Sequence, residues 1–389
     1  MFLQIHFLTS YHATLLNRDD AGLAKRINLG GVTRLRVSSQ CQKRHWREWM
    51  LERTDLPRGY RTRHFFNRIV KKKVVEKGID PELAHELIWH LGKTLLTAAG
   101  DKDALDKETL AMKQPVLFGN PEANFFVRLI EEAAQSEDVK KAQELITERL
   151  SKKNAKALME QAGLDDPAAG FEGALFGRFV TSDILARVDA PVHVAHAFTT
   201  HALDTEVDFF TVVDDLAGDE TGAAHANDME LGTGIYYGYV VVDVPLLMSN
   251  LTGCQRSEWL DQDPSDARKL LELLIQAVAE VSPGAKLGAT APYAKAECVL
   301  LEVGQSQPRS LANAFLRPVE VRHPGDNLMS RSISAMAEYM QAMDKMYGHS
   351  GEKRFLAVNP VHSWPGEDQP LPLREAIEHS LDAVFGENR

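Results

Sequence analysis

Cysteine is scarce in this chain of 389 residues: only Cys41, Cys254 and Cys298 occur, and they lie far apart. An odd number of scattered cysteines argues against a disulfide framework and a thiolate zinc site, and predicts a reducing, cytoplasmic location. The sequence also has no run of about 18 apolar residues, so no membrane-spanning helix and no membrane partner are expected. Its first residues lack the cationic lead and the cleavage site of a signal peptide.

Chemical motifs are equally sparse. No Walker motif, no other nucleotide-binding pattern and no convincing pair of nucleophile and base is present, so no cofactor is expected. Two sets of residues could suggest a metal: the histidines His193, His196 and His201, and the paired acids Asp19-Asp20 and Asp214-Asp215. Neighbouring residues of an extended chain point apart, and His193 and His196 would lie on opposite faces of a strand. We therefore expect structural roles and no metal site.

The charge is unevenly distributed. The chain has 44 basic and 55 acidic residues, a net charge of −11, yet residues 1–73 hold 16 basic residues and 5 acidic ones. An acidic protein with one basic pole is suited to holding a polyanion in a defined place while repelling it elsewhere. Charge alone leaves open the alternative that these residues merely solvate one lobe.

The basic pole has a local pattern that favours phosphate binding. Gly30-Gly31 and the segment 34–40 lead into a helix predicted over 40–51, for which Ser39 and Gln42 have capping-box spacing. Glycine-rich backbone and a helix N-terminus both offer N–H groups to an anion. One stripe of the helix is polar or basic and the neighbouring face apolar. The stripe contains Gln40, Lys43, Arg44 and Arg47, and the apolar face contains Trp46, Trp49 and Met50. A solvated helix face is the alternative explanation of the stripe.

Periodicity predicts an α+β protein. Strands are expected near the N-terminus and over 174–181, 192–198, 234–243 and 298–303, and helices over 264–281, 328–347 and 371–385. Residues 62–162 are predicted to be helical, with breaks at prolines, and to form an insertion because strands flank them. This order of elements does not fit alternating βαβ winding. Between 199 and 233 no core pattern occurs, but Phe209-Phe210 would expose one ring if the segment is extended.

Several sequence blocks together resemble the backbone subunit of the type I-E CRISPR Cascade complex, the CasC family. They occur in order over residues 3–316, and segments 60–170 and 320–389 match poorly. The blocks are Leu16-Asn-Arg-Asp-Asp20, Arg36-Val-Ser-Ser-Gln40 with Lys43-Arg44, Gly177-Arg178 with Thr181-Ser182, Ala195-His-Ala197, Thr199-Thr-His201, Asp208 with Phe210-Thr211, Val213-Asp-Asp-Leu216, Pro283-Gly-Ala-Lys286 and Leu311-Ala-Asn-Ala-Phe315.

The resemblance implies an RRM-like (ferredoxin-like) palm with an inserted helical finger lobe and a β-hairpin thumb. On this basis residues 1–58 begin the palm with its basic loop and helix, and 59–172 form the finger insertion. Residues 173–198 add palm strands, 199–233 form the thumb hairpin, and 234–389 complete the palm with C-terminal helices.

The resemblance also implies a function without catalysis. Copies of such a subunit stack head to tail along the CRISPR RNA and pre-order it for pairing with target DNA, beside the large, small, 5′-end and 3′-end capping subunits. DNA cleavage then belongs to a recruited helicase-nuclease. The implied RNA contacts are Arg18, Lys25, Ser38, Gln40, Lys43, Arg44 and Lys286, and the implied kink-packing residues are Phe179, Phe209, Phe210 and Thr211. Lys140 and Lys141 align with finger lysines that meet DNA, although Glu144 stands where another lysine is expected.

One rival function comes from related subunits. Backbone subunits of type III systems cut RNA with a loop aspartate, so Asp19 or Asp20 could serve a metal-dependent ribonuclease. Both aspartates, however, belong to the block shared with the non-cutting type I-E family.

Overall fold

The structure, a computed structural model, describes residues 1–97, 104–150, 170–178, 188–212, 225–321, 323, 326–348 and 352–386. The chain forms two compact units. Unit 1 comprises residues 1–54, 193–242 and 268–389, and unit 2 comprises residues 55–192 and 243–267. Unit 2 thus includes the segment 59–172, for which a helical insertion is predicted, together with a second segment farther along the chain.

A large sheet forms the centre of unit 1. Its main path has the order β11-β10-β1-β9-β7-β3-β2, and β6 and β8 also pair with β9. Along the described residues the strands are β1 (Phe2–Thr14), β2 (Arg26–Leu29), β3 (Val32–Val37), β6 (Val192–Val194), β7 (Ala197–Thr199), β8 (Thr205–Val212), β9 (His225–Asp243), β10 (Ala296–Gly304) and β11 (Lys353–Val358). The pairs β1–β10, β10–β11, β2–β3, β3–β7, β7–β9 and β8–β9 are antiparallel.

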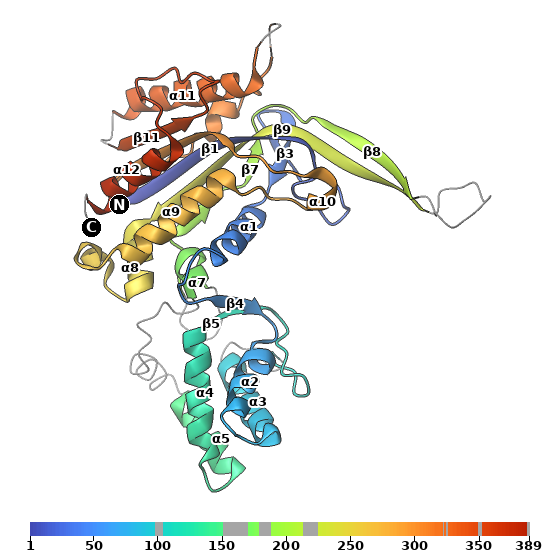
Figure 1. Cartoon of the computed structure of the whole chain (residues 1–389), viewed down its shortest axis with the longest axis vertical. Helices are drawn as coiled ribbons and strands as arrows, with labels where there is room; N and C mark the ends of the chain where they lie inside the picture. Colours follow the sequence, from blue (N-terminus) through green and yellow to red (C-terminus); the bar gives the residue numbers. More distant parts are fainter. Residues whose placement is uncertain are drawn as a thin grey trace, which may run out of the picture. The chain divides into compact units, whose positions relative to one another are not determined.

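Helices cover both faces of this sheet (Figure 1). The helices of unit 1 are α1 (Ser39–Leu51), α9 (Ser265–Glu280), α10 (Leu287–Thr290), the short 3-10 helix η3 (Ala312–Phe315), α11 (Leu328–Tyr347) and α12 (Leu373–Phe385). Leu8 of β1 belongs to the same buried cluster as Ile333 and Met336 of α11. Its neighbour Phe7 makes an edge contact with Trp46 of α1, with ring centroids 6.5 Å apart. Since successive side chains of a strand point to opposite faces, β1 is buried from both sides.

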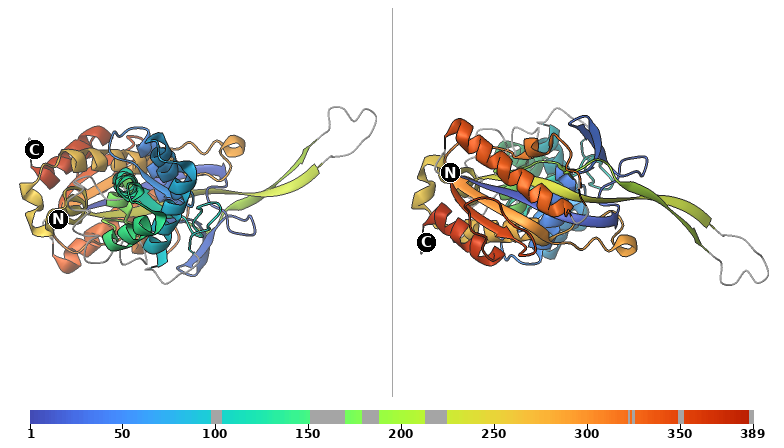
Figure 2. Two further views of the ribbon diagram at one scale, coloured as in Figure 1. Left: turned by 90° about the horizontal axis from the view of Figure 1, so that it is seen from below. Right: turned by 90° about the horizontal axis from the view of Figure 1, so that it is seen from above.

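A long two-stranded hairpin extends from the sheet. β8 pairs with the outer part of β9 in a continuous register from Thr205↔Gly232 to Val212↔His225. Both views of Figure 2 show β8 and β9 leaving the body of the sheet together. The inner part of β9 stays in the sheet between β1 and β7, where Tyr237 and Val240 are buried.

Unit 2 is mainly helical and has its own core. Phe65, Phe66, Phe118 and Phe126 pack together at its centre. Its elements are β4 (Gly59–Thr62), the π-helix η1 (Phe66–Lys71), α2 (Lys72–Glu76), α3 (Pro81–Thr97), β5 (Val116–Gly119), α4 (Asn120–Ala134), α5 (Val139–Arg149), α7 (Gly170–Phe176), α8 (Val244–Thr252) and the 3-10 helix η2 (Arg256–Asp261).

These elements confirm the predicted α+β class and correct two details. Residues 174–176, predicted as the start of a strand, lie in helix α7, while 179–181 fall outside the described residues. All residues of α7 from Gly170 to Leu175 are buried, and a short buried helix cannot be told from a buried strand by its apolar pattern. The predicted all-helical segment 62–162 also contains β5, which pairs with β4.

Candidate nucleic-acid interface

The loop over residues 17–25 is fixed to the start of α1 by hydrogen bonds. The side-chain oxygen Asn17 Oδ1 accepts from the Ser38 amide (2.9 Å), and the Asn17 carbonyl accepts from the Lys25 amide (2.9 Å). The Lys25 carbonyl in turn accepts from the Arg36 amide (2.8 Å). The loop, β3 and α1 therefore form one connected surface.

Within this loop, Arg18 is exposed and Asp19 is used internally. The Asp19 amide donates to the Leu23 carbonyl (2.8 Å), and Asp19 Oδ1 accepts from the Leu23 amide (2.9 Å). An Asp side chain that bonds to nearby backbone typically stabilises a turn. Asp20 is exposed. The turn holds the cationic side chain of Arg18 at the surface.

Ser38 caps helix α1. Its backbone is extended (φ −68°, ψ 149°), and its Oγ accepts from the Cys41 amide (3.3 Å). The predicted capping box of Ser39 and Gln42 is therefore wrong by one residue. Gln42 is buried and donates from Nε2 to the Ala195 carbonyl (3.0 Å). Its side chain therefore joins the helix to the segment between β6 and β7 instead of capping the helix.

Arg34 differs from the other arginines of the basic segment because it is completely buried. Its guanidinium donates to three backbone carbonyls, those of Leu29 (3.2 Å), Thr199 (2.8 Å) and Phe315 (2.5 Å). A buried cation needs such acceptors, and Arg34 has them on three separate segments. Arg34 therefore stabilises the fold, and its charge is not offered to a phosphate at the surface.

Positive charge gathers at the N-terminal end of α1. His196 Nδ1 accepts from the Ser39 amide (2.9 Å), and Nη1 of Arg36 lies 3.5 Å from the same nitrogen. Partial burial lowers the pKa of His196, and the charges of Arg36 and Lys25 lower this pKa further. The imidazole is therefore neutral, with its proton on Nε2. A helix N-terminus surrounded by cations is a favourable place for an anion.

The predicted stripe on α1 continues this surface. Gln40 and Arg44 are exposed, and Lys43 is half-buried, which lowers the pKa of its ammonium group by desolvation. Arg44 forms an exposed ion pair with Glu48 (2.9 Å), a hydrogen bond that raises the pKa of the guanidinium. Such exposed pairs contribute about 0–1 kcal/mol, so Arg44 can exchange Glu48 for a phosphate at little cost.

Lys286 lies in a loop that contacts the same region. The Ala285 amide donates to the carbonyl of Leu15 (3.0 Å), two residues before the loop over residues 17–25. Lys286 directly precedes the short helix α10 and is half-buried. The structure thus brings the predicted residues Arg18, Lys25, Ser38, Gln40, Lys43, Arg44 and Lys286 to connected segments of unit 1.

The hairpin carries the predicted aromatic residues. Phe209 is 66% exposed and Val207, two positions earlier on the same face of β8, is 69% exposed. Phe210 and Thr211 also belong to β8, but the structure describes only their backbone. Phe179 lies outside the described residues. An exposed phenylalanine on a projecting strand is available to stack against a base.

Unit 2 carries the two predicted DNA-contacting lysines. Lys140 and Lys141 are exposed on the first turn of α5, where Asp138 caps the helix by accepting from the Lys141 amide (2.8 Å). The Lys141 side chain pairs with Glu137. Their proposed role in DNA binding stays a prediction.

Neither a metal centre nor a membrane span is found in the part of the chain that the structure describes. No group of three or more potential ligand side chains is close enough there to hold a metal ion. His201 is occupied by backbone: its Nε2 accepts from the Ile235 amide (3.2 Å) and its Nδ1 donates to the Ala202 carbonyl (2.7 Å). None of the described helices combines the length and hydropathy that crossing a bilayer requires. Asp214 and Asp215 lie outside the described residues.

Three residues that organise this surface were not identified from the sequence. They are Asn17, His196 and Glu230, each of which accepts from a backbone amide of the basic segment. Asn17 and His196 belong to blocks that carry the family resemblance, and those blocks could have drawn attention to them. Nothing local marks Glu230, because its partner Ala24 is distant in sequence.

A sheet flanked by helices, from which a long hairpin projects, defines an α+β protein. Two solved structures share this fold over nearly the whole chain. One, from a "CRISPR RNA-guided surveillance complex, pre-nicking", is 24% identical and covers 99% of this chain and 100% of that chain with a TM-score of 0.77. The other, from a "CRISPR RNA-guided surveillance complex", is 20% identical and covers 97% of this chain and 100% of that chain with a TM-score of 0.66.

The chain belongs to the Cas_CT1975 family of CT1975-like proteins, whose model matches residues 3–383. No curated protein matches the chain. Together with the shared fold, this membership confirms the recognition of a Cascade-type CRISPR-associated protein. The narrower assignment to type I-E and to CasC stays a prediction.

Proposed function

We propose that this protein is a non-catalytic backbone subunit of a type I-E Cascade surveillance complex. Several copies bind along one CRISPR RNA, head to tail, and hold it in a shape that pairs with target DNA. The other Cascade subunits complete the particle. The observation that carries this proposal is the cationic surface at the N-terminus of α1, where the charges of Lys25, Arg36 and Arg44 act on Cys41 and His196. A repeated head-to-tail contact produces an open filament, which suits a linear RNA.

The strand order supports an RRM-like palm. β10, β1, β9 and β7 are consecutive neighbours in the sheet, with α1 following β1 in sequence and α9 lying between β9 and β10. This arrangement has the 4-1-3-2 order of a ferredoxin-like sheet, with β10 as the fourth strand. The β8–β9 hairpin supports the thumb, and the helices of unit 2 support the finger lobe.

The contacts of Asp19 favour binding over RNA cleavage. A metal-dependent ribonuclease needs carboxylate oxygens that are available to the metal. Asp19 Oδ1 instead accepts a hydrogen bond from the Leu23 amide, which closes a turn. Incubating the assembled protein with complementary RNA and magnesium tests this part of the proposal, because RNA cleavage would overturn it.

The nucleic acid that accompanies the protein tests the proposed function most directly. We expect protein purified under native conditions to carry a discrete RNA composed of repeat and spacer sequence. Light scattering should then detect a large defined particle in the presence of this RNA. A two-fold dimer that is indifferent to RNA would contradict the proposal.

A further inference from the structure

A basic pocket in unit 2 is not explained by any of the contacts assigned above. It has a volume of about 710 Å³ and lies between α3 and the segment 104–113. Four cationic side chains line it, those of Arg63, Lys93, Lys107 and Lys113, together with the ring of Trp89. In a chain with a net charge of −11, such a concentration of cations around an aromatic ring is distinctive.

Two lysines are positioned by the tryptophan ring. The Lys93 ammonium lies 4.8 Å from the centre of the Trp89 ring, and the Lys107 ammonium lies 4.9 Å from it. Lys93 follows Trp89 by one turn of α3, whereas Lys107 comes from the facing segment. Because a cation is attracted to an aromatic face, the ring holds both ammonium groups beside the pocket.

The segment that carries Lys107 is held rigidly. His85 of α3 binds the Lys107 carbonyl through Nε2 (2.8 Å), while its Nδ1 lies 3.2 Å from the Lys71 ammonium. Leu110 is fully buried although its φ of 54° lies in the left-handed region. A non-glycine residue in this conformation requires support from the surrounding structure, and such residues concentrate at functional sites.

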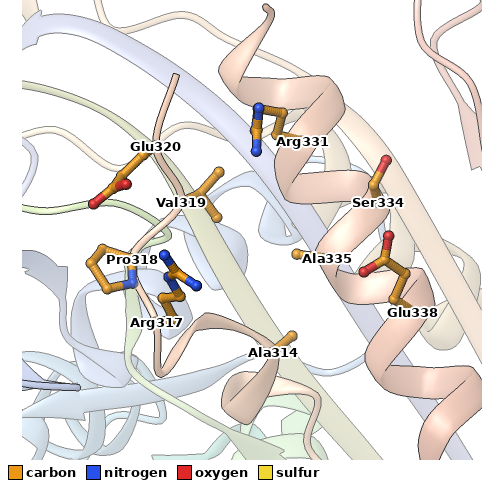
Figure 3. Close-up of a pocket in the computed structure, with 9 residues that line it drawn as sticks. All are labelled: Ala314, Arg317, Pro318, Val319, Glu320, Arg331, Ser334, Ala335 and Glu338. Carbon is orange, nitrogen blue, oxygen red and sulfur yellow. The ribbon is translucent and has the colours of Figure 1, made fainter. Parts of the chain in front are cut away.

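Acidic side chains of the pocket do not cancel its charge. Asp106 accepts from the amide (2.7 Å) and the hydroxyl (2.6 Å) of Thr109, which fixes its carboxylate in its own turn, and it offsets one of the four positive charges. Glu108 is the other acidic lining residue. A pocket of about 410 Å³ beside α11 in unit 1 differs in this respect. Figure 3 shows Glu320 and Glu338 among its lining residues together with Arg317 and Arg331, so two anions accompany two cations.

We propose that the unit 2 pocket binds the phosphate backbone of DNA, with Lys93 and Lys107 on the phosphates and the Trp89 ring beside a sugar or base. Cationic grooves with an aromatic face are the usual means of holding a nucleic-acid strand without reading its sequence. The assignment to DNA rests on the proposed function, in which unit 1 holds the guide RNA. It places the DNA contact of unit 2 on α3 and the segment 104–113, distinct from the lysines of α5.

The test compares two double variants of the full chain that lose the same charge. Lys93→Gln with Lys107→Gln alters the pocket, and Lys72→Gln with Lys77→Gln removes two exposed lysines, the first residue and the C-cap of α2, which pair with Glu76 and Glu131. Binding of labelled DNA without complementarity to the guide is measured as a function of salt, once as a duplex and once as a single strand. Thermal melting of each variant confirms that the fold is retained.

We expect the pocket variant to bind duplex DNA about ten-fold more weakly. The slope of log affinity against log salt concentration should become shallower by about 2, because two phosphate contacts are lost. The α2 variant should stay within about two-fold of the unaltered chain, because its lysines contact glutamates. If Trp89→Leu weakens single-strand binding more than duplex binding, the ligand is an unpaired strand; equal effects indicate the backbone of a duplex.

Two results would overturn the assignment: unchanged DNA affinity in the pocket variant, or an equal loss in the α2 variant. Guide RNA content is measured separately on the same preparations. Absence of guide RNA from the unaltered chain would refute the proposed function, while the pocket would still be tested by the same variants on protein without RNA.

Discussion

The carboxylate of Glu230 accepts a hydrogen bond of 2.8 Å from the backbone amide of Ala24, although more than 200 residues separate them. Glu230 also pairs with Arg26 and is 7% exposed. Since Glu230 lies on β9 and Ala24 ends the loop over residues 17–25, this contact joins the base of the hairpin to the basic surface. The β8–β9 hairpin and the basic surface, both of which we assign to RNA binding, are therefore directly connected.

Glu230→Ala should lower the free energy of unfolding by about 1–3 kcal/mol. The substitution leaves the buried amide of Ala24 without its acceptor, which costs the desolvation of that group. Urea unfolding measures the change. Glu206→Ala, an exposed carboxylate on the adjacent strand, is the matched control and should shift stability by no more than about 0.5 kcal/mol. Equal losses in the two variants would show that the contact with Ala24 has no special weight.

Replacing Lys43, Arg44 and Lys286 together by Ala should weaken the binding of every guide RNA alike. Phosphate contacts are independent of sequence. The loss of three of them should make the slope of log affinity against log salt concentration shallower by about 2 for a single strand. Filter binding at several salt concentrations measures both quantities.

A control for this triple variant removes three exposed lysines of unit 1, Lys269, Lys345 and Lys353. It loses the same charge at other positions. If its affinity falls as far as that of the first variant, the effect is one of overall charge and not of the surface around α1.

Phe209→Ala should leave the fold intact and reduce guide-dependent DNA capture. The ring is mostly exposed, so its removal costs the core little, whereas a stacked base contributes about 1–3 kcal/mol. Thermal melting and a DNA-capture assay separate the two effects. Val207→Ala on the same face of β8 tests whether the aromatic ring or merely apolar area is required. A clearly lower melting temperature for Phe209→Ala would mean that the ring packs within the fold.

Stability should depend on pH through a buried carboxylate in unit 1. Burial alone would raise the pKa of Glu302, but the neighbouring His6 and Arg309 hold this pKa well below its usual value. His6 Nε2 lies 3.3 Å from Glu302 Oε2, and Arg309 and Arg354 each donate to Oε1 at 3.0 Å. A lowered pKa contributes stability that is complete above the unfolded-state value of about 4.3 and is lost as the pH falls toward the folded-state value.

Glu302→Gln should therefore destabilise the protein by about 1–3 kcal/mol at pH 7, because Arg309 and Arg354 lose one of the two carboxylates that they share, the other being Asp344. The difference in the free energy of unfolding between the variant and the unaltered chain should become smaller as the pH falls below about 4. Urea unfolding at both pH values measures it. Glu280→Gln, which removes a partly exposed partner of Lys295, should change stability by less than about 1 kcal/mol. A difference for Glu302→Gln that is independent of pH would contradict this account.

The sequence predicts the regular parts of this fold well where periodicity is long. The helix expected over 328–347 matches α11, and the apolar run of 234–243 lies in β9. Short segments are less predictable: β4 and β5 have four residues each and depend on pairing with one another across the chain. Arg34 shows why parts of the site cannot be predicted from the sequence. Its burial against three backbone carbonyls results from tertiary packing and leaves no local sequence pattern.

The 19-residue length of β9 has a mechanical consequence. Its inner half pairs with strands on both sides, whereas the strand that pairs with its outer half is β8. A pull along the strand axis loads the interstrand hydrogen bonds in shear, so that many resist at once, because these bonds run across the strands. Because the same strand continues into the sheet, a load on the hairpin is carried directly to the part of β9 that contains the buried Tyr237.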